Sequence, residues 1–171
     1  SENLNIKENT KLLNLTPQYA ETNRGKVFYK KAIIATHFPI INKHGSYFLK
    51  MYQHRSYVLA LENAQKLEGM YIDEDIKGLS FRNHGEYLLL GGGSHRTGKK
   101  GGCWAELEEF AKKYYPKAKI AYKWATQDCM SLDGIAYIGN YSKNTPNLFV
   151  ATGYNKWGFT SAMVAAELLS D

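Results

Sequence analysis

Apolar and polar residues follow two different periods along this chain, and each period predicts one kind of element. Short apolar stretches bounded by glycine, proline or asparagine are typical of strands. They predict strands at residues 12–15, 19–22, 26–30, 31–36, 56–62, 70–72, 79–83, 86–90, 122–125 and 148–151. The alternation Ser80-Phe81-Arg82-Asn83 suits a sheet with one exposed face. His84-Gly85-Glu86 predicts a hairpin turn.

A longer period predicts helices in two places. Over residues 104–115, Trp104, Leu107 and Phe110 recur at helical spacing, with glutamates early and lysines late, as the helix dipole favours. Pro116 ends this helix, because proline lacks the N–H that a continuing helix needs. Small residues after the last strand predict a second helix over 161–170.

This order of elements predicts an α+β fold. We expect an antiparallel or mixed sheet with a covering helix over residues 40–124. Two pieces of a second layer, residues 1–39 and 125–171, would flank it.

Composition narrows the class of protein. Hydrophobic residues make up 44% of the 171 residues, and the mean hydropathy of −0.45 is ordinary for a globular chain. The apolar runs fall far short of the ~20 residues that a membrane span needs. Two cysteines, Cys103 and Cys129, are too few for a disulfide framework, so we expect reduced thiols, a cytoplasmic setting and no membrane partner.

The net charge of +6 raises nucleic acid as a partner. The lysines and arginines are scattered, however, and form no recognised reader motif, so we expect none. Metal sites are not expected either. The five histidines are dispersed, and the chain has no Cys-x-x-Cys or His-x-x-x-His pair. Neither cysteine is followed closely by a histidine, so a Rieske cluster cannot be housed here.

One basic segment suggests a different function. Gly93-Ser94-His95-Arg96-Thr97-Gly98-Lys99-Lys100 is one residue from a phosphate-binding P-loop. Lys100 stands where Ser or Thr would bind Mg²⁺, and Gly101-Gly102 delays the helix. We therefore expect a flexible basic turn. A stand-alone binding domain that uses the glycine-rich loop 93–102 is the alternative function, and P-loop-like nucleotide binding is a weaker one.

The C-terminal part carries a more specific pattern. Trp124 and Asp133-Gly134 precede Ile138-Gly139, and a strand then leads into Gly153-Tyr154 and Gly158. This stretch resembles the C-terminal part of the D-amino-acid oxidase-like family of FAD-dependent oxidoreductases, which includes glycine oxidase and sarcosine oxidase. Upstream, residues 22–27 and 31–36 resemble the β-meander of that family and the strand that re-enters its FAD domain. The resemblance covers nearly the whole chain.

The resemblance implies an FAD cofactor and a division of the chain. Residues 40–124 would be the substrate domain, while 1–39 and 125–171 would belong to the FAD domain. The N-terminus of the last helix would face the pyrimidine side of the flavin, where its free N–H groups favour negative charge. The implied cofactor-binding residues are Gly153, Asn155, Trp157, Gly158, Phe159 and Thr160. Some members of this type carry a fused Rieske domain, which would lie outside this chain.

The resemblance also implies a substrate site. The family oxidises amines or amino acids by hydride transfer to flavin, leaving an imine that hydrolyses. Its carboxylate-binding arginines fall here on Asp128 and Lys156. Asp128 would favour a cationic amine, Lys156 could attract an anion, and Tyr154 lies in the turn itself. A surface position for Lys156, or hydrogen bonds from nearby backbone N–H groups to Asp128, are the alternatives.

One family motif has no counterpart in the sequence. The Gly-x-Gly-x-x-Gly phosphate finger of the FAD domain is missing. We therefore expect this chain to be one portion of a longer protein, whose N-terminal part would be its partner. Alone, the chain is expected to bind FAD weakly or not at all and to show no turnover.

Overall fold

The computed structural model describes residues 4–41, 45–75 and 78–170 and has an α+β fold, as the sequence predicts. The elements within these residues are β1 (Leu12–Leu15), β2 (Tyr19–Thr22), β3 (Gly25–Phe28), β4 (Ala32–Ile34), α1 (Tyr47–Lys50), β5 (Met51–Glu62), β6 (Tyr71–Ile72), β7 (Ser80–His84), β8 (Tyr87–Arg96), α2 (Cys103–Tyr114), β9 (Lys119–Ser131), β10 (Tyr137–Asn140), β11 (Leu148–Thr152) and α3 (Gly158–Ser170).

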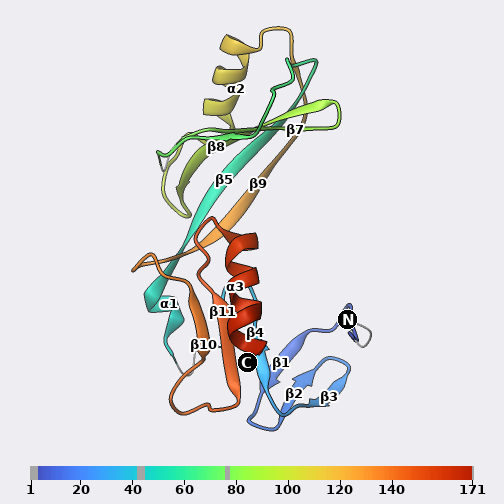
Figure 1. Cartoon of the computed structure of the whole chain (residues 1–171), viewed down its shortest axis with the longest axis vertical. Helices are drawn as coiled ribbons and strands as arrows, with labels where there is room; N and C mark the ends of the chain where they lie inside the picture. Colours follow the sequence, from blue (N-terminus) through green and yellow to red (C-terminus); the bar gives the residue numbers. More distant parts are fainter. Residues whose placement is uncertain (1–3, 42–44, 76–77, 171) are drawn as a thin grey trace.

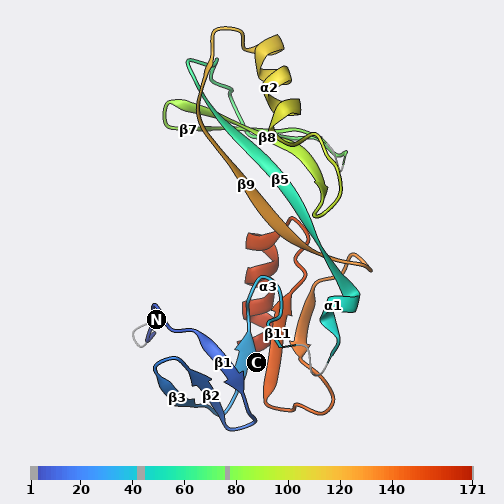
Figure 2. The same ribbon diagram turned by 180° about the vertical axis from the view of Figure 1, so that it is seen from behind.

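The molecule is elongated, and two long strands join its ends. An antiparallel sheet of order β6-β7-β8-β5-β9 forms the upper part in Figure 1, with α2 against it. The lower part contains the sheet β10-β11-β4, α3 beside it, and the meander β1-β2-β3. In both Figure 1 and Figure 2, β5 and β9 run side by side from one part into the other.

The upper core lies between the sheet and α2. Alternate residues of β5 and β8 point toward the helix, because successive side chains of a strand face opposite sides. The buried residues of this core are Tyr57, Leu59, Leu61, Leu88, Leu90, Leu107 and Ala111. Burying one leucine of this kind contributes about 1.5–3 kcal/mol relative to leaving it in water. On the other face, Val58 and Leu89 are only partly buried and Trp124 is exposed, so this face of the sheet is open.

The lower core forms around β11. This strand pairs in parallel with β4 and antiparallel with β10. Its Val150 packs with Ile34 and Tyr141, and with Met51 and Cys129 from the ends of the two long strands. The long strands are therefore anchored in both cores.

The predicted elements are found, but three strands are longer than the pattern indicates. β5 begins at Met51 rather than 56, β8 continues to Arg96 rather than 90, and β9 covers Lys119–Ser131 rather than 122–125. Most residues of the extensions are polar or glycine, although Met51 and Cys129 are buried in the lower core, and the cross-strand pairing continues along them. The expected boundary between residues 124 and 125 falls inside β9.

Two glycines adopt nearly the same left-handed backbone in different surroundings. Gly85 has φ 55° in the β7–β8 turn, where an added Cβ would meet nothing within 4 Å. Gly93 has φ 61° inside β8, where an added Cβ would collide with the backbone carbonyl of Cys103. The left-handed conformation costs a residue with a Cβ about 1–2 kcal/mol.

Alanine substitutions at these two glycines distinguish the cost of backbone strain from the cost of close packing. We expect Gly85→Ala to lower the free energy of unfolding by about 1–2 kcal/mol, the left-handed cost alone. Gly93→Ala should lower it by clearly more, because α2 must shift to admit the methyl group. Urea denaturation of both variants measures the difference, and equal losses would contradict the close approach of Gly93 to Cys103.

Candidate functional site

The chain leaves β11 through a turn that brings α3 against the sheet. Gly153 has φ 69°, and an added Cβ there would lie 3.3 Å from Met51 Sδ and 3.4 Å from Tyr137 Cδ2. Asn155 also has a left-handed φ of 55°, which asparagine tolerates better than most residues. α3 begins at Gly158, and the first N–H groups of an α-helix have no partner within the helix. The start of α3, which carries these donors, lies beside β5 and β9 in Figure 1.

The side chain of Asn155 holds this turn to the end of β9. Its Oδ1 accepts hydrogen bonds from the N–H and the hydroxyl of Ser131, at 3.1 Å and 3.4 Å. Its Nδ2 donates to the carbonyl of Gly134 at 3.1 Å, and its backbone N–H donates to the carbonyl of Cys129 at 3.1 Å. Asp133, whose carboxylate accepts from the N–H of Ile135, orders the neighbouring loop.

The turn faces a polar stretch of the open sheet face. His54 of β5 pairs with Asp128 of β9, and Ser56 pairs with Thr126. Directly opposed residues of antiparallel strands share a face. His54, Thr126 and Asp128 come from the extended parts of β5 and β9, which the hydrophobic pattern does not reveal, and Ser56 is the first residue of the predicted strand.

Lys156 links the turn to this face. Its Nζ donates to Ser94 Oγ at 3.4 Å, and Ser94 Oγ lies 3.2 Å from Ser56 Oγ. A cavity of about 450 Å³ lies between the turn and the sheet. Its lining includes Ser56, Ser94, Thr126, Met130, Asn155, Lys156 and Trp157, with Asp73, Glu74 and Asp75 also contributing. Asp128 does not line this cavity. It lies between Thr126 and Met130 in the row of every second residue of β9, and these three side chains share one face.

Burial shifts two titratable groups of this site toward their neutral forms. Desolvation raises the pKa of Asp128, and the positive charges of Lys156 and His37 oppose part of that rise. Desolvation also lowers the pKa of His54, and Lys156 and His95 lower it further. Lys156 thus influences both groups. Such combinations of burial and specific charge partners are common in functional sites.

The structure brings some of the sequence-predicted residues together and leaves others on the surface. Asn155, Lys156 and Trp157 line the cavity, with Asn155 partly buried and the other two exposed. Tyr154 is partly buried, and burial raises its pKa. Phe159 and Thr160 lie on the exposed first turn of α3. Ser56, Ser94 and His54 also belong to this site, and the sequence pattern does not reveal them. The glycines and lysines around Ser94 indicate a basic turn, and nothing in the pattern links Ser94 to Lys156.

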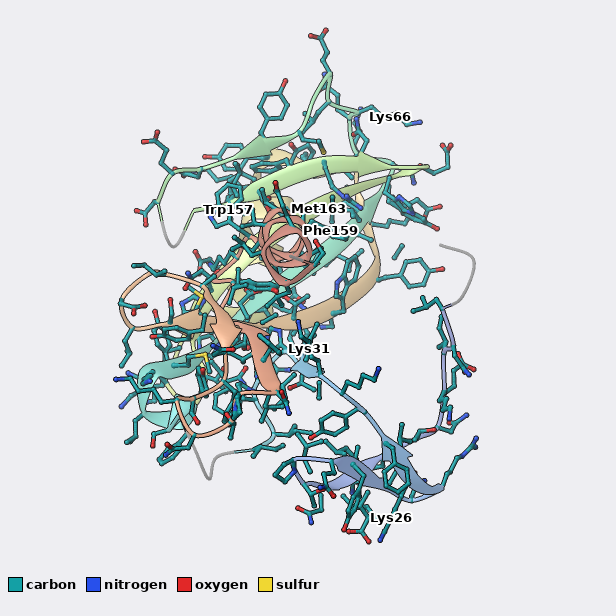
Figure 3. All side chains as sticks on the ribbon, turned by 60° about the horizontal axis from the view of Figure 1, so that its bottom comes forward. Lys26, Lys31, Lys66, Trp157, Phe159 and Met163 are labelled. Atoms are coloured by element: carbon teal, nitrogen blue, oxygen red, sulfur yellow. The ribbon has the colours of Figure 1, made fainter. Side chains whose placement is uncertain are left out.

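An apolar surface surrounds the start of α3. Trp157, Phe159 and Met163 are 65%, 96% and 72% exposed, and Figure 3 shows them around the helix. Ala165 is the buried residue of α3. At Gly158 an added Cβ would meet nothing within 4 Å of the described chain. A flat ligand lying against the backbone would account for a glycine here and for the uncovered aromatic side chains.

Three further findings concern metal ligands, membrane-spanning helices and the cysteines. Among residues 4–41, 45–75 and 78–170, no group of three or more His, Cys, Asp or Glu side chains could hold a metal ion. No helix within those ranges is long and apolar enough to cross a membrane. Cys103 and Cys129 are both free thiols.

Residues 2–171 match the protein family described as FAD dependent oxidoreductase. The chain is 37% identical over 163 residues to the putative Rieske 2Fe-2S iron-sulfur protein YhfW of Bacillus subtilis (strain 168), which covers 91% of this chain and 32% of that protein. The fold is similar to glycine oxidase from Geobacillus kaustophilus, with a TM-score of 0.77, 18% identity, and 95% of this chain and 47% of that chain covered. The fold is also similar to L-proline dehydrogenase from P. horikoshii, with a TM-score of 0.71, 16% identity, and 94% of this chain and 49% of that chain covered. The chain thus spans about a third of the curated relative and about half of each solved structure.

The hydrogen bonds of Asn155 generate a stability prediction. Asn155→Ala removes the side-chain bonds to Ser131 and Gly134 and also strains a left-handed backbone. We expect the free energy of unfolding to fall by about 1–3 kcal/mol. Asn155→Gly is the matched control, because it relieves the strain but loses the same bonds. Denaturant unfolding should rank native above Asn155→Gly above Asn155→Ala, and a native-like Asn155→Gly would show that the side-chain bonds contribute nothing.

Asp128 generates a pH-dependent prediction. Its pKa is raised in the folded state, so the folded chain holds that proton more tightly than the unfolded chain does. Stability then falls as pH rises from about 4 through the folded pKa, and the full penalty applies above it. Asp128→Asn removes the penalty, so its melting temperature at neutral pH should exceed the native value. Each kcal/mol recovered raises Tm by about 2–4 °C.

The matched control is Asp133, whose pKa is shifted in the opposite direction. The N–H of Ile135 and other donors lower the pKa of Asp133, so its contribution is present above the unfolded pKa and is lost as pH falls through the folded one. Asp133→Asn should therefore lower Tm at neutral pH. Melting curves from pH 3 to 8 test both variants. An Asp128→Asn protein no more stable than native at neutral pH would contradict the assigned cost of burying this carboxyl.

Proposed function

The chain belongs to the FAD-dependent oxidoreductase family, and we propose that it supplies the substrate side and one edge of the flavin site of an oxidoreductase acting on an amine or amino-acid-like substrate. The proposal rests on one arrangement above all. Lys156, two residues before α3 begins, reaches the sheet through its hydrogen bond to Ser94, and its charge acts on Asp128 of β9. The cavity of about 450 Å³ at this place suits a small substrate.

The residues present fit an FAD at the turn. Gly158 leaves the backbone open to a flat ring, and Trp157 and Phe159 offer uncovered aromatic surface. The N–H groups at the start of α3 would hold the pyrimidine edge of the flavin, where the helix dipole favours negative charge. When bound, FAD would accept the hydride from the substrate carbon.

The charges suggest how a substrate would be oriented. The Lys156 ammonium attracts an anionic group, and its hydrogen bond to Ser94 limits the motion of a long side chain. Asp128 attracts a cationic amine, or accepts a hydrogen bond from a neutral one. Together they would orient an amino-acid-like molecule without the bidentate clamp that an arginine gives. Two proteins of similar fold, glycine oxidase and L-proline dehydrogenase, are named for such substrates.

The rest of the site would come from other parts of a longer protein. The sequence holds no Gly-x-Gly-x-x-Gly finger for the FAD pyrophosphate. This chain on its own would therefore retain FAD weakly or not at all and would not turn over. A relative of similar sequence is named as a Rieske protein. A Rieske domain in the longer protein is part of the proposal, and its cluster would use ligands outside this chain.

The function is tested in the longer protein that carries the dinucleotide-binding segment. Flavin reduction is followed anaerobically at its visible absorbance with a panel of amines and amino acids. Asp128→Asn should lower kcat/KM by about 10–100-fold for the best substrate, because a charge-assisted hydrogen bond contributes about 1.5–3 kcal/mol. Lys156→Met should raise KM for substrates that carry a carboxylate and spare simple amines.

A matched control is Glu86→Gln, an acid exposed at the β7–β8 turn and far from the cavity along β8. It should leave the kinetics unchanged. If no amine reduces the flavin, the proposed reaction is wrong. If amines reduce it but Asp128→Asn behaves like Glu86→Gln, the reaction stands and the role of Asp128 is wrong.

A further inference from the structure

A second cluster of reactive side chains lies on the opposite face of the sheet. Cys103 Sγ, at the first residue of α2, is 3.7 Å from His95 Nε2 at the end of β8. The hydroxyl of Tyr57 lies 2.9 Å from the same nitrogen, and the Tyr57 ring stacks on the imidazole. Tyr57 belongs to the core that α2 covers, so this cluster is separate from the face that holds Asp128 and Lys156.

Backbone contacts fix the tautomer of His95. Its Nδ1 lies 2.9 Å from the carbonyl oxygen of Arg96, which can only accept a hydrogen bond, so Nδ1 carries the proton. Nε2 is then the basic nitrogen and faces both the thiol and the phenol. The contact with Cys103, and then burial, raise the pKa of Tyr57, so its hydroxyl stays protonated. A protonated phenol can donate either to Nε2 or to the sulfur.

The glycine-rich segment builds this arrangement. An added Cβ at Gly101 would collide with the His95 ring, and one at Gly93 would collide with the Cys103 carbonyl. The chain between β8 and α2 therefore folds back tightly enough to bring Cys103 against His95. These close contacts fill the inside of the turn with protein atoms. The basic segment that resembles a P-loop thus positions a cysteine–histidine pair.

The two cysteines of the chain have contrasting environments. Cys129 is 2% exposed in the lower core, and its thiol contacts Met51 Sδ at 3.5 Å. Cys103 is partly exposed and faces a base. Thiolates rather than thiols are the nucleophiles, and a neighbouring histidine or a helix N-terminus favours the thiolate. Cys129 therefore serves as an unreactive internal reference.

We propose that Cys103 is a nucleophilic thiol with His95 as its general base, a site of covalent modification by soft electrophiles and by hydrogen peroxide. His95 Nε2 takes the thiol proton, and Tyr57 donates its hydroxyl hydrogen to the sulfur. With peroxide, the sulfur attacks one oxygen, an S–O bond forms and the O–O bond breaks. Sulfur is oxidised by two electrons to the sulfenic acid, and the leaving hydroxide takes the proton from His95 to give water. This site does not depend on the proposed oxidoreductase function.

The test measures modification of each cysteine in the native chain at neutral pH. Iodoacetamide alkylation is followed by peptide mass spectrometry, with glutathione as the reference thiol. We expect Cys103 to react about tenfold faster than glutathione or more, as an activated thiolate does, and Cys129 to stay unmodified. After treatment with hydrogen peroxide, dimedone should trap a sulfenic acid at Cys103. Alkylation of Cys103 no faster than that of glutathione would overturn the proposal, whatever the variants show.

Two variants assign the role of the base. His95→Gln should bring the rate at Cys103 down to that of glutathione, while Tyr57→Phe should retain most of it, because Nε2 remains. Protection of Cys129 in each variant reports that the lower core is intact. A native rate in His95→Gln would show that His95 is not the base. If Cys129 is alkylated in His95→Gln, that substitution has disturbed the fold. His95→Asn then tests whether His95 is the base, and the rate of native Cys103 relative to glutathione still tests the proposal.

Discussion

The site depends on the pairing of β5 with β9 along their whole length. One end of this ladder is buried in the upper core through Leu59 and Leu61, and the other is buried in the lower core through Met51 and Cys129. Between the two cores the strands carry polar residues that would not form a strand by hydrophobic pattern alone. The ladder holds them in register because both of its ends are fixed by apolar burial.

Because the register of the strands is fixed, two clusters of polar and reactive side chains lie on opposite faces of the sheet. Odd and even positions of a strand point to different sides. Along β5 and β8 one set packs beneath α2 and includes Tyr57 and His95. The other set includes Ser56 and Ser94 and faces the turn before α3. A one-residue slip of the register would move each set to the wrong face, so the bulge between Arg55 and Tyr57 in the β5–β8 pairing affects both clusters.

The sequence allows the α+β class and most elements to be predicted, because local signals such as Pro116 and the hydrophobic spacing of residues 104–115 act over a few residues. It also locates the turn from Gly153 to Gly158, since glycines and the strand before them are visible in order. The contact between Lys156 and Ser94 could not be predicted. It joins positions far apart in the chain through three strands whose pairing is set by the whole fold. The same is true of the contact between Cys103 and His95, which depends on how closely the chain approaches itself at Gly93 and Gly101.

The charges at the open face do not act independently. Lys156 opposes the rise in the pKa of Asp128 and adds to the fall in the pKa of His54, so removing its ammonium would alter the protonation of both groups. Effects of substitutions within this set will therefore not add, as is usual for residues that share one electrostatic environment. Because burial raises the pKa of Asp128, a smaller fraction of this carboxyl is ionised at a given pH than of an exposed one. In the proposed site, a preference of Asp128 for a cationic amine would therefore depend on the charge of Lys156. The lysine that would attract a substrate's anionic group would also keep Asp128 ionised to receive its amine.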